Sequence, residues 1–419
     1  MPTSMQRASD RSATPSPGPG EAAVLPMTAC LIVGVTAHRD LVPDEVPALE
    51  AAVDAFLHRM QGLHPDLPVA VMSGLAEGGD RLVARRALAL GLPLVAPLPL
   101  PLEEYRRDCT SPASVLELDT LLASAQAIHL PLAEGNDPGS VCVPGPARDR
   151  QYAQLGVFIS SHCQVLLALW DGTASEAAGG TSDVVRYHLH GEMPGLGRVD
   201  APPNLLADDD SDLAFHLVCS RLRNDARADG ALGTHWLTRG ARSDGAGPMP
   251  DGYRRLFDQL GEFNADARLY ADDIERDSHG LLPPPEIAPP RGSLPRIDAL
   301  YRRADWLALH FRQRVHHSMA LLHVLAVLTG LLLMTYAEFI AHPLLMGAIL
   351  GLFAAGAAVA WLGNRRSWHR RYLDYRVLAE GLRVQAYWAI ASVPSSHRVG
   401  FAYDSFLQKQ DVELGWIRH

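Results

Sequence analysis

Cysteine is scarce in this chain of 419 residues, and positive charge is in deficit. The five cysteines include no C-x-x-C pair; they are Cys30, Cys109, Cys142, Cys163 and Cys219. This usage predicts neither a zinc site nor a disulfide scaffold, so we expect no metal or cofactor, and it is typical of a reducing cytoplasm. Lys and Arg number 37 against 47 Asp and Glu, a net charge of −10. Because phosphate contacts need clustered cations, the chain is a poor candidate for binding nucleic acid.

The N-terminal region lacks a long apolar stretch. Residues 1–27 are rich in Ser, Pro, Gly and Ala, which predicts a disordered tail and no signal peptide. The whole chain is 47% apolar, which excludes a wholly disordered protein. At roughly 150 residues per domain, its length allows two or three units.

Apolar residues concentrate in two segments near the C-terminus, 318–340 and 343–362. The first carries one charge, Glu338, and the second carries none. A bilayer core needs about 20 helical residues, so the pattern predicts a two-helix transmembrane hairpin, with a pair of buried helices in a soluble core as the alternative. Gly347 and Gly351 in the second segment would permit close helix approach, and we expect a homo-oligomer.

Arginines flank both apolar segments, and the turn between the segments has no Lys or Arg. The flanking residues are Arg302, Arg303, Arg312, Arg314, Arg365, Arg366, Arg370 and Arg371. By the positive-inside rule, this predicts a multi-pass protein of the inner (cytoplasmic) membrane with both termini in the cytoplasm.

Short apolar runs alternate with helix-period stretches from residue 28 to residue 192. The expected strands are Cys30–Thr36, Leu67–Met72, Leu92–Leu98, Ala127–Leu130 and Gln164–Trp170. Uniformly apolar strands that alternate with helices predict an α/β fold, a Rossmann-like parallel sheet with helices on both faces. A helical extension and an α-helical two-transmembrane hairpin would follow this sheet.

Ligands of such sheets bind outside the carboxyl ends of the strands. The loops expected there are Gly34–Asp40, Ser73–Asp80, Pro97–Pro101 and Asp171–Asp183. Two of them are Gly-rich and lead into helices, so their backbone N–H groups could bind a phosphate. The alternative is that the glycines serve only tight turns and that the acids Asp80 and Asp183 complement helix dipoles. The pair His38 and Arg39, directly after a buried strand, is well placed to meet a phosphate or a base.

The same loops carry a family resemblance, which covers about residues 28–192. The motifs are Gly34-Val-Thr-Ala-His-Arg-Asp-Leu41, Leu75-Ala-Glu-Gly-Gly-Asp-Arg-Leu-Val-Ala84, Leu98-Pro-Leu-Pro101 with Tyr105, Trp170-Asp-Gly172 and Gly179-Gly-Thr-Ser-Asp-Val-Val185. In this order they resemble the SLOG superfamily, the Rossmannoid group that contains LOG-type phosphoribohydrolases and DprA-type DNA-processing proteins. The resemblance implies a nucleotide-derived ligand held by Gly34, Ser73, Gly74, Gly78, Gly179, Gly180 and Thr181.

The loops at the carboxyl ends of the strands and the SLOG-like motifs together define the candidate ligand-binding residues. They are Gly34, Thr36, His38, Arg39, Ser73, Gly74, Glu77, Gly78, Gly79, Asp80, Pro99, Trp170, Asp171, Gly179, Gly180, Thr181 and Asp183.

One departure bears on catalysis. The hydrolytic LOG branch carries Gly-Gly-x-Gly-Thr-x-x-Glu, whereas here the glutamate position is Val184 and the acid stands one residue earlier, at Asp183. One residue turns a helical side chain by about 100 degrees. This favours ligand binding over hydrolysis. Two alternatives remain: a LOG-type N-glycosidase or phosphoribohydrolase with Glu77 or Asp183 as the acid/base, and DprA-type DNA handling, which the acidic balance disfavours.

Residues 193–296 carry few signals. We expect an extension and a linker, with loops at Asp208–Asp212 and Leu281–Pro295 and helices at Phe215–Arg223 and Tyr253–Ile274.

The C-terminal part, 297–419, has a basic helix, the two apolar segments and the run Tyr375-Arg-Val-Leu-Ala-Glu-Gly-Leu-Arg383. Helical spacing predicts that Glu380 pairs with Arg376 and Arg383. The arrangement resembles the SLATT family of two-transmembrane modules that accompany SLOG sensors. This resemblance implies a membrane sensor–effector in bacterial (antiphage) defence, in which a nucleotide-derived signal drives assembly or opening of a pore. Its expected partners are that small molecule, the lipid bilayer and further copies of the chain.

Overall fold

The computed structural model describes residues 28–174, 179–191, 193, 213–223, 227–282, 294–339 and 342–391. The predicted N-terminal tail, the Asp208–Asp212 loop and most of the Leu281–Pro295 loop lie outside the described residues.

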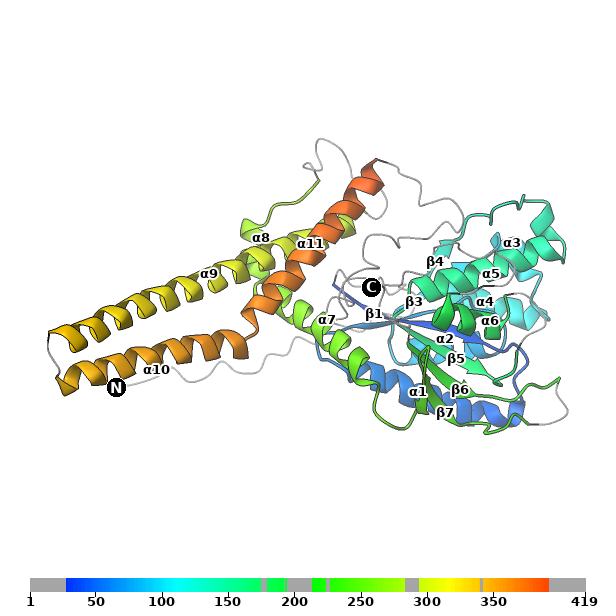
Figure 1. Ribbon diagram of the computed structural model, residues 1–419. Coiled ribbons are helices and arrows are strands. Elements are labelled where there is room, and N and C mark those ends of the chain that lie inside the picture. The colour runs from blue at the N-terminus through cyan, green and yellow to red at the C-terminus, as the bar shows by residue number, and fades with distance from the viewer. Residues whose placement is uncertain are drawn as a thin grey trace, which may run out of the picture.

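A sheet of eight strands forms the centre of the body, which comprises residues 28–282 (Figure 1). In chain order the strands are β1 Leu31–Ala37, β2 Val69–Met72, β3 Leu94–Leu98, β4 Gln126–His129, β5 Val165–Trp170, β6 Leu213–Val218, β7 Thr234–Leu237 and β8 Arg242–Asp244. Their spatial order is β4-β3-β2-β1-β5-β6-β7-β8. Strands β1 to β6 pair in parallel, and β7 and β8 add an antiparallel edge. The α/β prediction is confirmed, and the five expected strands are all present.

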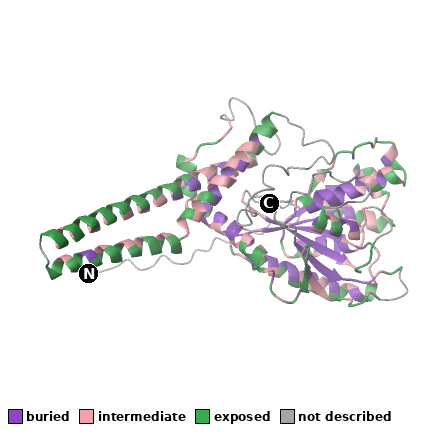
Figure 2. Cartoon of the chain, viewed as in Figure 1, coloured by how far each residue is buried: buried purple, intermediate pink, exposed green. Residues whose placement is uncertain are grey.

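Helices cover both faces of the sheet, as predicted. The helices of the body are α1 Val46–Gln61, α2 Gly79–Ala89, α3 Leu102–Arg106, α4 Pro112–Ala123, α5 Pro146–Ser161, α6 Thr181–His190, α7 Asp251–Leu269 and α8 Ala271–Asp277, with single 3-10 turns at Pro43–Glu45 and Ser140–Cys142. On one face, α1, α2, α4 and α7 contribute to a single apolar core together with strand residues such as Leu31 and Val33 of β1. On the other face, α5 and α6 pack on β5 residues such as Leu166 and Ala168. The central strands β1, β2, β3, β5 and β6 are therefore buried on both sides (Figure 2).

One secondary-structure prediction is wrong. The segment Phe215–Arg223 was expected to be a helix, but β6 occupies Leu213–Val218 and lies between β5 and β7. All six of its residues are buried. A strand buried on both faces shows no alternation, so a short apolar run does not distinguish it from a buried helix. The second helix expected there, Tyr253–Ile274, is confirmed by α7 and α8.

The C-terminal helices form a module that leaves the body as a long arm (Figure 1). They are α9 Leu294–Glu338, α10 Pro343–Arg365 and α11 Trp368–Ile390. Helix α9 runs unbroken for 45 residues because Pro295 stands in its first turn and no further proline comes before Pro343. Helix α10 runs back beside α9, and α11 crosses the part of α9 nearest the body.

The far part of the arm, residues 318–338 of α9 together with α10, is called the apolar hairpin below. Both helices are long and apolar enough to cross a membrane. No residue in the most apolar stretch of α9 is buried. Large apolar side chains such as Leu331 and Phe353 are exposed instead (Figure 2). The alternative of two helices buried in a soluble core does not hold for these helices within the chain.

Ion pairs join the near part of the module to the body. Asp266 of α7 accepts bonds from Arg371 Nη1, at 2.8 Å, and from the hydroxyl of Tyr375, at 2.6 Å, both on α11. Beside them, Glu262 of α7 pairs with Arg370 at 2.5 Å. The predicted pairing of Glu380 with its arginine neighbours is also confirmed.

Candidate functional site

The order of the strands places a switch point at the carboxyl end of β1. Strand β1 lies between β2 and β5, and the chain continues from β1 to one side and reaches the other side only through β5. The backbone N–H of His38 donates to the carbonyl of Leu169 at 3.0 Å, so both strands end at the same edge. Ligands of open α/β sheets bind at such a point. The region at the carboxyl ends of β1, β2 and β5 is called the crevice below, after the ligand site of such sheets. The loops after β1 and β5 are two of the four predicted from the sequence.

His38 and Asp171 meet across this switch point. Nε2 of His38 lies 3.1 Å from both the backbone nitrogen and Oδ1 of Asp171. Burial lowers the pKa of His38, although the Asp171 carboxylate opposes this, so the neutral ring accepts the amide N–H. Burial opposes ionisation of Asp171, but bonds from Thr173 outweigh it and lower the pKa of that carboxyl group. Among the described residues, Asp171 Oδ2 is buried and has no hydrogen-bond donor.

Arg39 is the exposed cation of the crevice. Its guanidinium carbon lies 5.3 Å from the ring centroid of Tyr152 on α5. The hydroxyl of Tyr152 donates to Asp108, and Asp108 pairs with Arg148 at 2.7 Å. Tyr152, Asp108 and Arg148 were not singled out in the sequence, because they lie on a helix and a loop far from the Gly-rich motifs. They extend the site on the α5 side of Arg39.

The turn before α2 is closed by glycine. Gly78 has a φ of +85°, and a Cβ there would overlap the carbonyl oxygen of Arg39. The next N–H, of Gly79, donates to the carbonyl of His38 at 3.0 Å. The two glycines therefore hold the β1 and β2 loops together in a tight turn. The N–H of Gly79 already has an acceptor within the protein.

The rest of the β2 loop also bonds within the protein. The Ser73 hydroxyl is buried and accepts the N–H of Leu75 at 3.2 Å, and the carbonyl of Gly74 accepts the hydroxyl of Tyr105 at 2.6 Å. Glu77 accepts the N–H of Thr110 at 2.8 Å and the hydroxyl of Ser114.

Burial opposes ionisation of Glu77, but these bonds outweigh it and lower its pKa. A carboxylate held in this way is a poor general acid, since that role needs a raised pKa.

Asp80 has a raised pKa, as a general acid/base would require. It lies in the first turn of α2 and is 7% exposed, and burial raises its pKa from 3.8 to about 7, although Arg39 opposes this. Asp80 was predicted as a ligand-binding residue and not as an acid/base. The shift arises from burial, which the Gly-Gly-Asp motif does not reveal.

The Gly-rich loop after β5 starts α6. Gly179 lies close to the backbone of Ala153 on α5, and its N–H donates to Asp183 Oδ2 at 3.1 Å. Asp183 also pairs with Arg186, so both of its oxygens are occupied. Gly180 is the N-cap of α6 and Thr181 is its first residue.

Val184, at the position of the LOG glutamate, is 4% exposed in the core between α5 and α6. Neither position therefore offers a free carboxyl group: both oxygens of Asp183 are bonded, and residue 184 is a buried valine.

Four other predicted residues lie at the margin of the crevice or away from it. Gly34 is inside β1 and packs against Cys163, while Thr36 is buried near the end of the same strand. Pro99 is buried after β3. Trp170 ends β5, and its indole N–H donates to the carbonyl of Thr173 at 2.7 Å.

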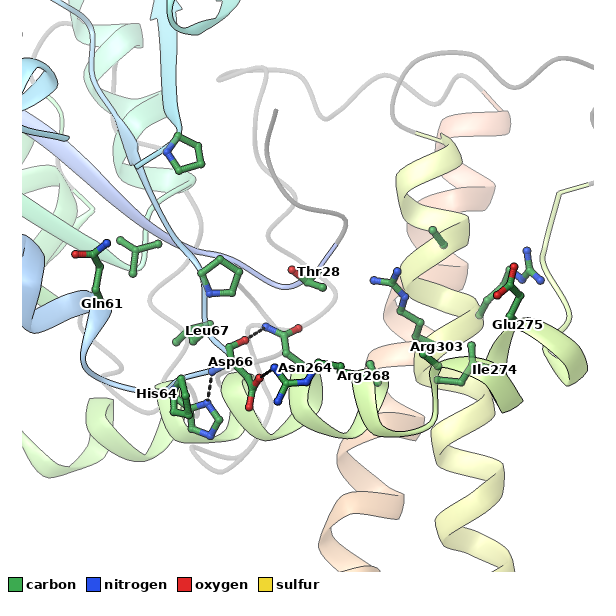
Figure 3. A pocket seen from close by; sticks show the side chains of 18 of the residues that line it. Thr28, Gln61, His64, Asp66, Leu67, Asn264, Arg268, Ile274, Glu275 and Arg303 are labelled. Carbon is green, nitrogen blue, oxygen red and sulfur yellow. Dashed lines mark hydrogen bonds and ion pairs between the residues drawn. The ribbon is translucent and has the colours of Figure 1, made fainter. Parts of the chain in front are cut away.

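An open hollow of about 650 Å³ adjoins the crevice on its α2 side. It is lined by Arg39, Glu77, Arg81, Thr110, Ser111, Ala113, Ser114 and Glu117. A larger cavity, of about 860 Å³, lies at the opposite edge of the sheet, where the body meets α9 (Figure 3). No group of three or more His, Cys, Asp or Glu in the described residues could hold a metal ion.

Comparison of the chain with models of protein families finds no match, and comparison with curated proteins finds none either.

Proposed function

We propose that the protein is a membrane-anchored sensor–effector, with a SLOG-like domain at residues 28–192 that binds a nucleotide-derived signal and a SLATT-like module at residues 297–419 that acts in the bilayer. The observation that carries the proposal is the continuity of α9. Its first half packs on the body and on α11, and its second half is an exposed apolar segment. A change at the body therefore reaches the apolar hairpin through one unbroken helix.

The crevice supports a phosphate- and hydroxyl-bearing ligand. Arg39 supplies an exposed cation, and the N-termini of α2 and α6 both open at this edge of the sheet. Asp171 Oδ2 is a buried oxygen without a donor among the described residues, and it would accept a ligand hydroxyl, such as that of a ribose, once the atoms that cover it move. These three features match the phosphate and the sugar of a nucleotide.

In the bilayer, both ends of the hairpin carry arginine, so the body and both termini belong on the cytoplasmic side of the inner membrane. We further propose that the signal drives assembly of several copies, or opening of a pore between their hairpins, in antiphage defence. For this to occur, the signal must bind the assembled or open arrangement more tightly than the resting one.

A second function is favoured by one observation. Asp80 is a buried carboxyl group with a pKa of about 7, beside the cation Arg39, which suits a general acid/base of a tethered N-glycosidase. The occupied oxygens of Asp183 and the buried side chain of Val184 count against it.

The first test is ligand binding by the full chain in neutral detergent. Thermal shift is measured with nucleotides, cyclic oligonucleotides and ADP-ribose derivatives, and each ligand that binds is recovered and analysed. An intact ligand supports the sensor, and a cleaved one supports the hydrolase. Arg39→Ala should remove binding, whereas Arg107→Ala, which changes an exposed arginine of the neighbouring loop, should not.

The second test is ion flux. The wild-type chain is placed in liposomes, and release of a trapped ion is followed after addition of the ligand found above. Flux that depends on the ligand, and is lost in Arg39→Ala, supports the proposal. Confirmed binding without any flux would contradict the pore.

A further inference from the structure

The cavity at the joint between body and module has three walls. One is made of the loops at residues 61–69 and 91–93, which lie at the amino ends of β2 and β3. The second is made of α7 and α8, and the third is the start of α9, at Ala299, Arg302 and Arg303 (Figure 3). Its volume of about 860 Å³ falls in the range of small-molecule sites, which occur preferentially between domains.

The α7 wall is fixed by hydrogen bonds. Asn264 donates to the carbonyls of Ala29 and Asp66, both at 2.8 Å, and its own carbonyl accepts the N–H of Ala29 at 3.1 Å. Arg268 pairs with Asp66. All polar atoms of the Asn264 amide are thus engaged, and this side of the cavity is formed in advance of any ligand.

The α9 wall carries one cationic group with spare hydrogen-bond donors, the guanidinium of Arg302. Nε of Arg302 donates to the hydroxyl of Ser278 at 3.0 Å. Within the described part of the chain this is the one hydrogen bond of Arg302, so its two terminal amino groups have no acceptor there. Burial lowers the pKa of Arg303, the next residue, which Figure 3 shows on the cavity side of α9.

The charge of the lining favours an anion. Among the described residues of the lining, three arginines stand against two carboxylates, and Asp66 is already paired with Arg268. The other carboxylate, Glu275, is exposed on α8. An anion bound to Arg302 would satisfy the terminal N–H groups in a fork geometry that suits phosphate or carboxylate.

We propose that the joint cavity binds a small molecule with a phosphate or carboxylate group, held between Arg302 of α9 and the amino edge of the sheet. A phospholipid headgroup does not fit, because Arg303 lies 15 helical residues, about 22 Å, before the apolar segment begins at Ser318. The site is separate from the crevice and does not depend on the function proposed for it. Because the ligand touches both sides of the joint, it stabilises the docked arrangement of body and module.

The experiment uses the full chain in neutral detergent. Thermal unfolding is followed with inorganic phosphate, pyrophosphate or citrate, against chloride at equal ionic strength, and the concentration dependence gives an apparent affinity. We expect at least one of these anions to raise the midpoint. Arg302→Ala should weaken the affinity at least tenfold, and Arg302→Lys, which keeps the charge, should weaken it less. Ala299→Phe should block the cavity and remove the effect without loss of charge.

Two variants serve as matched controls. Arg312→Ala removes an exposed arginine of the same helix that does not line the cavity, and it should bind as wild type does. Arg39→Ala changes the crevice and should also keep the affinity, so failure of this site and failure of the crevice site are distinguishable. The proposal is overturned if no anion exceeds chloride, if Arg302→Ala binds like wild type, or if Arg39→Ala abolishes the effect.

Discussion

Burial decides the strength of the two ion pairs that join α7 to α11. The Asp266 side chain is 8% exposed and accepts bonds from both Arg371 and Tyr375. Removing one partner of a buried pair costs about 3–5 kcal/mol. Arg371 is 25% exposed and lies 4.0 Å from Glu262, so it keeps some solvation and one other anion. We therefore expect Asp266→Asn to lower the free energy of unfolding by about 3 kcal/mol, the lower end of that range.

Two further variants at the same joint should cause smaller losses of stability. Tyr375→Phe removes one hydrogen bond to a charged group but keeps the ion pair, and should cost about 1.5 kcal/mol. Glu262→Gln breaks the neighbouring pair with Arg370, in which both side chains are about one-third exposed, and should cost less than about 1 kcal/mol.

The assay is thermal unfolding of the full chain in neutral detergent, followed by tryptophan fluorescence. The unfolding midpoint should decrease most for Asp266→Asn, less for Tyr375→Phe and least for Glu262→Gln. Equal shifts for Asp266→Asn and Glu262→Gln would refute the reasoning, since the two acids lie one turn apart on α7 and differ chiefly in burial.

Three other predictions follow from single residues. Because burial raises the pKa of Asp80 from 3.8 to about 7, the folded state holds a proton that the unfolded state has lost. The free energy of unfolding should fall by up to about 4 kcal/mol as the pH rises through this window. In thermal midpoints measured between about pH 5 and 8, Asp80→Asn should remove this pH dependence. His38, whose pKa burial lowers, contributes a slope of opposite sign in both proteins. Identical slopes for the wild type and the variant would contradict the prediction. Gly78→Ala should cost about 3 kcal/mol, from a φ of +85° and a backbone clash, and an unchanged midpoint would contradict this. Leu331→Arg places a charge on the apolar hairpin at a cost of about 3 kcal/mol and should reduce recovery in the membrane fraction, whereas Leu222→Arg on the equally exposed surface of the body should not.

The sequence predicted the parts of the fold that local pattern controls. The strands β1, β2, β3 and β5 are short apolar runs, and the apolar hairpin has the length and composition of two membrane spans. The strands β7 and β8 are four and three residues long and carry no apolar run, so the pairing of β7 with β6 and of β8 with β7 was not visible. Trp236 of β7 had no nameable partner in the sequence. It packs against Phe56 of α1 and Phe215 of β6, residues brought together only by the fold.

The sequence predicted which loops form the candidate site, but it did not predict the hydrogen bonds that these loops make. The loops after β1 and β5 do meet at the switch point, because parallel strands place their carboxyl ends at one edge. The bonds of Glu77 come from the loop that carries Thr110 and from Ser114 of α4, more than 30 residues away in sequence. No local pattern encodes such contacts. The same holds for Tyr152, whose ring reaches Arg39 from α5.

The unbroken course of α9 makes it a lever. At 1.5 Å per residue, its 45 residues span about 68 Å from the joint to the hairpin turn. A tilt of roughly 5 degrees about its first turn would carry the far end by about 6 Å, slightly more than the pitch of an α-helix. In some switching proteins one packed element moves past another by one such turn. Adjustments of a few degrees beside Arg302 would therefore be large enough, at the turn of the hairpin, to change which helix faces meet.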